Sequence, residues 1–140
     1  MRPLPWMDRI GVCVSAACGV HCALMGVALV VWPTLWLQQT RFGVDLRWLV
    51  ILEMTLAVLA LLFALTALGL GTLRHGRWRP WAFGLPGLTL VCSGVFTPLH
   101  DEPLLGSAVV LGGGLLIVLA HVENLRAGRR HRAAKPTAAV

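Results

Sequence analysis

Charged residues are scarce in this sequence. Only 13% of its 140 residues are Asp, Glu, Lys or Arg, whereas 57% are hydrophobic. A soluble domain averages about 25% charged and roughly 45–50% apolar residues. The composition therefore excludes a disordered chain, a disulfide-stapled secreted module and most soluble enzymes. Motifs typical of enzymes are also missing, because we find no phosphate-cradling glycine loop after a strand, no HExxH and no nucleophile elbow. We predict that the protein is not an enzyme.

What the sequence has instead is a set of long runs almost free of charge. There are 31 uncharged residues between Arg9 and Arg41, and Glu53 is the only charge in the second run. A transmembrane helix needs about 20 apolar residues, and in lipid the backbone must satisfy its own hydrogen bonds. The runs predict an all-α, integral membrane bundle of four transmembrane helices near 10–37, 47–73, 81–99 and 104–125. Pro86 lies inside the third run, so we expect a kink or a late helix start there.

The basic residues predict the orientation of the bundle. The formal net charge is +6, and ten of the twelve Lys and Arg residues fall on one side of the predicted spans. Nucleic-acid binding would need a basic face or groove, so we expect no nucleic-acid partner. By the positive-inside rule both termini are cytoplasmic. Residues 1–125 would form the membrane domain, and residues 126–140 would form a basic cytoplasmic tail.

The first span carries a stripe of small and metal-ligating residues. At 100° per residue, a stripe about 120° wide holds Gly11, Ser15, Cys18, His21, Cys22 and Met25. Thiolates and thioethers suit copper(I), zinc and heavier thiophilic ions, and residues at i, i+3 and i+4 are neighbours. The spacing therefore predicts a metal site at Cys18, His21 and Cys22. Packing is the alternative, because cysteine is a good core residue and the histidine could bond another helix. The other two cysteines, Cys13 and Cys92, are predicted to be packing residues.

Two further residues, Glu53 and His121, are candidates for binding the ion or carrying protons as it crosses the membrane. Glu53 places a carboxylate inside a span, and an ionisable residue there is by default expected to have a function. It also lies near enough to the outer boundary to be solvated or paired with an arginine. His121 shares the packed face of the fourth span with Asn124, where it is a ligand, a proton carrier or a hydrogen-bonding partner of another helix. By depth, a path for a cation would run from the outer loop His100-Asp101-Glu102 to Glu53, the cysteines and finally His121.

Two segments of the sequence are similar to a known family. The first runs from Met7-Asp8-Arg9-Ile10-Gly11 through Ser15 to Cys18-Gly19-Val20-His21-Cys22. The second runs from Gly112-Gly113-Gly114 through Ala120 to Arg126. Both resemble the MerC-domain membrane proteins, which include mercuric-ion uptake proteins of mercury-resistance systems. The resemblance implies a bacterial inner-membrane protein that passes Hg(II) inward on a first-span cysteine pair, here Cys18 and Cys22.

The chain departs from the mercury transporters of that family in two ways. Three residues, one of them His21, separate its first-span cysteines where those transporters have two, and its tail has no cysteine. It resembles more closely the branch with a Cys-x-x-His-Cys core.

We therefore predict a membrane protein that binds and moves a thiophilic ion, either Hg(II), Zn or Cu. The ligands would be Cys18, Cys22 and His21, with Glu53 and His121 as further candidates. The ion is substrate or ligand, no resident cofactor is expected, and the partners are the ion and the lipid bilayer, with a homo-oligomer left open. Two alternatives remain open: a haem or redox protein using His21 and His121, and a structural assembly subunit without a site.

Overall fold

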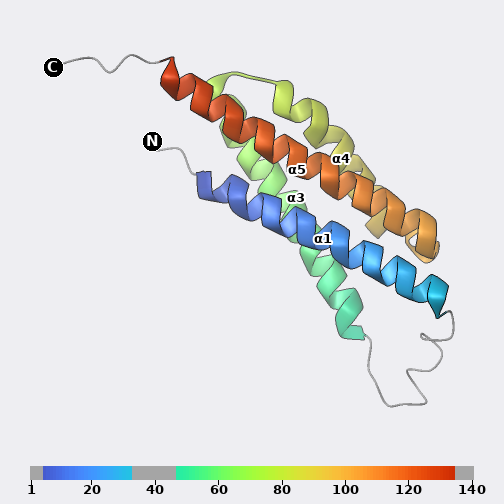
Figure 1. Ribbon diagram of the computed structural model, residues 1–140. Coiled ribbons are helices and arrows are strands. Elements are labelled where there is room, and N and C mark those ends of the chain that lie inside the picture. The colour runs from blue at the N-terminus through green and yellow to red at the C-terminus, as the bar shows by residue number, and fades with distance from the viewer. Residues whose placement is uncertain (1–4, 33–46, 135–140) are drawn as a thin grey trace.

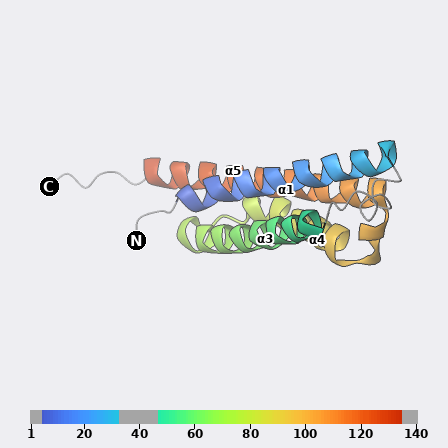
Figure 2. The ribbon, with the colours of Figure 1, turned by 90° about the horizontal axis from the view of Figure 1, so that it is seen from below.

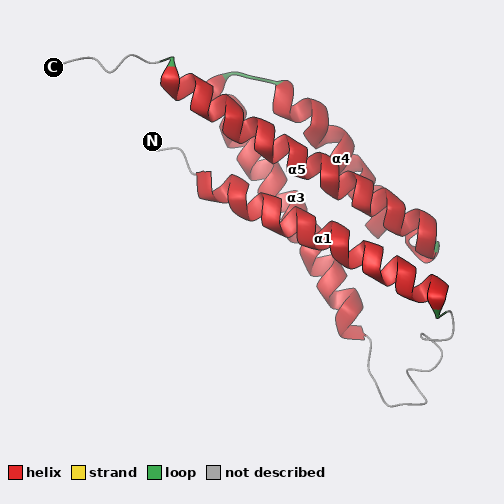
Figure 3. Cartoon of the chain, viewed as in Figure 1, coloured by secondary structure: helices red, strands yellow, loops and turns green. Residues whose placement is uncertain are grey.

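The structure is a computed structural model that describes residues 5–32 and 47–134. In these two stretches the chain is helical with short connections and contains no strand (Figure 3), which confirms the predicted all-α class. The elements are α1 (Pro5–Val31), α3 (Arg47–His75), α4 (Arg79–Phe96), the 3-10 helix η1 (Pro98–Asp101) and α5 (Pro103–Ala133).

The four long helices pack in two layers. Figure 2 shows α1 and α5 in one layer and α3 and α4 in the other. Within this arrangement α5 contacts every other helix, most extensively α1 and α4. The start of α1 and the end of α5 lie at the same end of the bundle (Figure 1). We call this end, which also holds the α3–α4 connection, the inner end.

Three helices are long and apolar enough to cross a membrane, namely Trp6–Val31, Arg47–His75 and Leu104–Ala133. The helix α4 has only 18 residues and contains Pro86. The late helix start that was one of the two expectations at Pro86 is not observed. The helix begins at Arg79 and continues through the proline. Helices in lipid tolerate proline because neighbouring groups satisfy the freed backbone, and α4 lies against α5 along its length (Figure 1).

Two helices differ from their predicted bounds. α1 begins at Pro5 and ends at Val31 rather than spanning 10–37, and residues 33–37 lie outside the described residues. α5 continues to Ala133, into the segment that we assigned to the tail. Arginine and alanine are strong helix formers, and cations near a helix C-terminus interact favourably with its dipole. The last turns of α5, with their basic residues, therefore extend the helix beyond its apolar part.

Small residues line the helix contacts, as the sequence predicts. The buried face of α3 is made by Glu53, Ala57, Ala60, Ala64, Ala67, Leu68 and Gly71. Between α4 and α5 the backbones touch, because a Cβ added at Gly87 would lie 2.9 Å from the carbonyl oxygen of Gly113. Close approach through small residues is how helices associate in lipid, where the surroundings are as apolar as the side chains.

Candidate metal site and inner polar network

Cys18 and Cys22 form a buried thiol pair on α1. Their exposed fractions are 1% and 2%, and Ser15, one turn earlier on the same face, is 0% exposed. Residues four apart on a helix are neighbours, so the two sulfur atoms lie side by side where α1 packs into the bundle. His21 and Met25 are only half-buried, at the edge of the stripe. The predicted packed face of the first span is confirmed, and its centre is the cysteine pair.

A carboxylate from the other layer reaches this pair. Glu53 of α3 is 9% exposed, and its Oε1 accepts a hydrogen bond of 3.4 Å from the Cys22 thiol. Glu53 therefore faces the bundle interior. A buried carboxylate costs free energy unless it is paired and hydrogen-bonded, so its position beside a thiol is a specific feature of the fold.

The five candidate ligands do not form one centre. In the part of the chain that the structure describes, no group of three or more His, Cys, Asp or Glu side chains could hold a metal ion. Cys18 and Cys22 lie together and Glu53 reaches Cys22, but His121 lies at the inner end. His21 contributes a ring whose Nε2 is buried and has no hydrogen-bond partner among the described residues.

The other two cysteines were assigned wrongly. Cys13 and Cys92 are exposed rather than packed inside the bundle. Each belongs to the outward face of its helix, which a chain crossing a membrane presents to lipid, so an apolar thiol costs little there.

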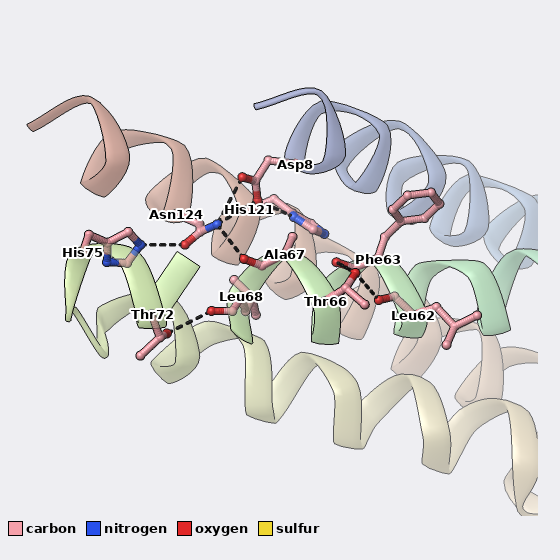
Figure 4. Close-up of polar contacts among 10 residues, drawn as sticks. All are labelled: Asp8, Leu62, Phe63, Thr66, Ala67, Leu68, Thr72, His75, His121 and Asn124. Carbon is pink, nitrogen blue, oxygen red and sulfur yellow. Dashed lines mark hydrogen bonds and ion pairs between the residues drawn. The ribbon is translucent and has the colours of Figure 1, made fainter. Parts of the chain in front are cut away.

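A second polar cluster lies at the inner end, and we call it the inner polar network (Figure 4). The Asp8 carboxylate of α1 lies 3.0 Å from His121 Nδ1 and accepts bonds of 3.0 and 3.1 Å from the Asn124 amide. That amide also donates to the Ala67 carbonyl, and its oxygen lies 2.9 Å from His75 Nε2. The network ties α1, α3 and α5 together inside the bundle.

Glycines on two helices make room for this network. A Cβ at Gly11 would collide with the His121 ring, and a Cβ at Gly71 would collide with the Asn124 amide. The prediction for His121 included a bond to a neighbouring helix, and the bond to Asp8 fits that alternative. Asp8 was part of the segment that resembles the family but was not predicted as a site residue, although its position three residues before Gly11 continues the stripe of the first span.

The two histidines of the haem alternative are far apart. His121 packs against Gly11, and His21 lies ten positions further along α1, or about 15 Å of helix. The geometry therefore does not favour a shared iron between them.

Comparison with known proteins gives one family. A family model described as MerC mercury resistance protein matches residues 8–126. No curated protein and no solved structure matches the chain. The matched region begins at Asp8 in the inner polar network and includes the thiol pair, Glu53, the whole of α3 and α4 and most of α1 and α5.

Proposed function

The chain belongs to the MerC mercury resistance family, and on this premise we propose that it binds Hg(II) at the thiol pair and passes the ion through the membrane toward the cytoplasm. The observation that carries this proposal is the burial of Cys18 and Cys22 together, with the Glu53 carboxylate on the Cys22 thiol. Thiolates are the soft ligands that thiophilic cations prefer.

The ligand count favours mercury over zinc. Structural zinc sites are closed by four protein ligands and catalytic ones use three. The described residues offer no group of three or more ligating side chains. Hg(II) forms stable complexes with two thiolates alone, so the thiol pair is sufficient for this ion.

Glu53 can accept the proton that the Cys22 thiol loses when it binds the ion. A thiol must lose its proton when it coordinates a metal, and in a buried site that proton needs an acceptor nearby. The Cys22 thiol already donates to Glu53 Oε1, so the proton has a short path to the carboxylate. This arrangement makes cation binding at Cys22 compatible with a membrane interior.

We place α4 as the fourth span. Its 18 residues make a helix about 27 Å long at 1.5 Å per residue, close to the hydrocarbon thickness of about 30 Å. Four crossings agree with the start of α1 and the end of α5 lying at one end (Figure 1). The arginines of the α3–α4 connection and of the last turns of α5 lie at that end, which supports cytoplasmic termini in an inner membrane.

The binding test uses the exposed cysteines as an internal control. In a Cys13→Ser/Cys92→Ser background the thiol pair is the only source of thiolate. Purified protein in lipid nanodiscs is titrated with Hg(II), and bound metal is measured after gel filtration. We expect one Hg(II) ion per chain, lost when either Cys18 or Cys22 is also changed to serine. Binding that survives removal of both would refute the site.

Transport is tested in cells. Cells that express the background protein should accumulate radiolabelled Hg(II) faster than cells without it, and the Cys18→Ser/Cys22→Ser variant should abolish the difference at equal expression. Retained uptake in that variant would contradict the proposed role of the pair.

A further inference from the structure

Two buried polar atoms stand between the thiol pair and the inner polar network. Ser15 Oγ and His121 Nε2 belong to side chains that are 0% exposed, and neither has a hydrogen-bond partner among the described residues. Buried polar atoms are nearly always bonded, so each unpaired one calls for an explanation.

The network determines which nitrogen of His121 carries hydrogen. His75 Nδ1 accepts the Arg77 backbone N–H, so its Nε2 donates to the Asn124 oxygen. The Asn124 amide then donates to both oxygens of Asp8. With Asp8 as acceptor, His121 Nδ1 donates to it. In the neutral ring, which has one donor and one acceptor, His121 Nε2 is then the acceptor that lacks a hydrogen.

Ser15 is placed to supply a hydrogen to that nitrogen. α1 and α5 run in opposite directions (Figure 1), and a Cβ at Gly11 would meet His121 while one at Gly114 would lie 3.0 Å from the Ser15 carbonyl. Helical side chains lean toward the N-terminus of their own helix, so Ser15 and His121 lean toward each other. In Figure 4 the second ring nitrogen of His121 lies on the side away from Asp8.

We propose that His121 is the acceptor for the proton that Cys18 loses when Hg(II) binds, with Ser15 as the link through internal water. This inference rests on the function proposed above. Two S–H bonds break and two S–Hg bonds form. The Cys22 proton goes to Glu53, and the Cys18 proton goes to His121 Nε2. Ser15 lies three residues before Cys18 on the same buried face, so the path stays inside the bundle.

The buried charges support the same assignment. Asp8 and Glu53 are the buried carboxylates of the described chain, at 7% and 9% exposure. Two such carboxylates, when ionised, balance the charge of one divalent cation. Asp8 is the titratable group in contact with His121, and His75 follows across Asn124. The other ionisable side chains described near the inner end are exposed or half-buried, namely Arg9, Arg74, Arg77, Arg79, the Glu123–Arg126 pair, Arg129, Arg130, His131 and Arg132.

The test observes the His121 ring directly. Protein with ¹⁵N-labelled histidine, in the Cys13→Ser/Cys92→Ser background in nanodiscs, is studied by NMR, and the His121 resonances are assigned from their loss in a His121→Gln variant. The pH is chosen so that the metal-free spectrum shows a neutral ring with hydrogen on Nδ1. One equivalent of Hg(II) is then added, and bound metal is measured on the same sample.

Each outcome decides between the two proposals. Hg(II) bound at the thiol pair together with hydrogen on both ring nitrogens supports the inference. Bound Hg(II) with an unchanged neutral ring overturns it and leaves the proposed function intact, and so does a ring nitrogen bonded to the metal. Absence of binding overturns both. Ser15→Ala should keep Hg(II) binding and lose the protonation of His121, whereas Ser107→Ala, on α5, should change neither. Unchanged protonation in Ser15→Ala would remove Ser15 from the path.

Discussion

The contact between α4 and α5 depends on two glycines whose backbones touch. A Cβ added at Gly113 would lie 2.9 Å from the Gly87 carbonyl oxygen and 2.9 Å from the Val91 backbone nitrogen. Backbone atoms cannot rotate away as a flexible side chain can, so the helices must separate. Overpacking of this kind costs about 1–3 kcal/mol. We therefore expect Gly113→Ala to weaken the attachment of α4 to the bundle.

The neighbouring glycine is the matched control. A Cβ at Gly112 would have no heavy atom within 4 Å, and alanine is better than glycine inside a helix by about 1 kcal/mol. Gly113→Ala should therefore be less stable than Gly112→Ala by about 1–3 kcal/mol, which is the overpacking cost alone, because both variants gain the same helix propensity.

The comparison is made by reversible unfolding in mixed micelles, with increasing sodium dodecyl sulfate and tryptophan fluorescence as the readout. Both variants carry the same composition, so differences in micelle binding cancel. Equal free energies of unfolding for the two variants would refute the close crossing of α4 and α5, and with it the placement of α4 as a packed span.

Three further predictions concern the polar sites. Glu53→Gln removes the carboxylate that accepts the Cys22 hydrogen, so stopped-flow absorbance should show slower Hg(II) binding. Glu123→Gln, which changes a partly exposed ion pair, is the control. Equal rates of Hg(II) binding in the two variants would exclude Glu53 as proton acceptor. Asp8→Ala leaves two buried donors unpaired and should lower the free energy of unfolding by about 1–3 kcal/mol; no loss in the micelle titration would mean that the network is not buried. Cys13 and Cys92 should react with a lipid-soluble maleimide in the folded protein and the thiol pair only after unfolding, as counted by mass spectrometry; labelled pair cysteines in folded protein would contradict their burial.

Much of the helix packing could be predicted from spacing alone. The α1 stripe through Ser15 and Cys18 is buried as expected, and the buried face of α3 that carries Glu53 and the alanines follows the same helical spacing. This succeeds because a helix turns by a constant angle, so small and polar residues at helical spacing identify the side that avoids lipid. The ends of helices were less predictable. α5 continues through its arginines because helix propensity, rather than hydrophobicity, decides where such a segment ends.

The sequence by itself determined that this is a helical membrane protein with a cysteine pair on an inward face, because both properties depend on composition and local periodicity. Only the tertiary structure decided which residues meet. Glu53 lies beside Cys22, although the two are 31 residues apart in the chain. His121 bonds Asp8, 113 residues away in the chain, and does not join the metal site. Such pairings follow from the relative register of helices. That register is set by where backbones can approach, as at Gly87 and Gly113, and by where a glycine leaves room for a buried side chain, as at Gly11 and Gly71. A one-dimensional pattern contains no information about the opposite helix.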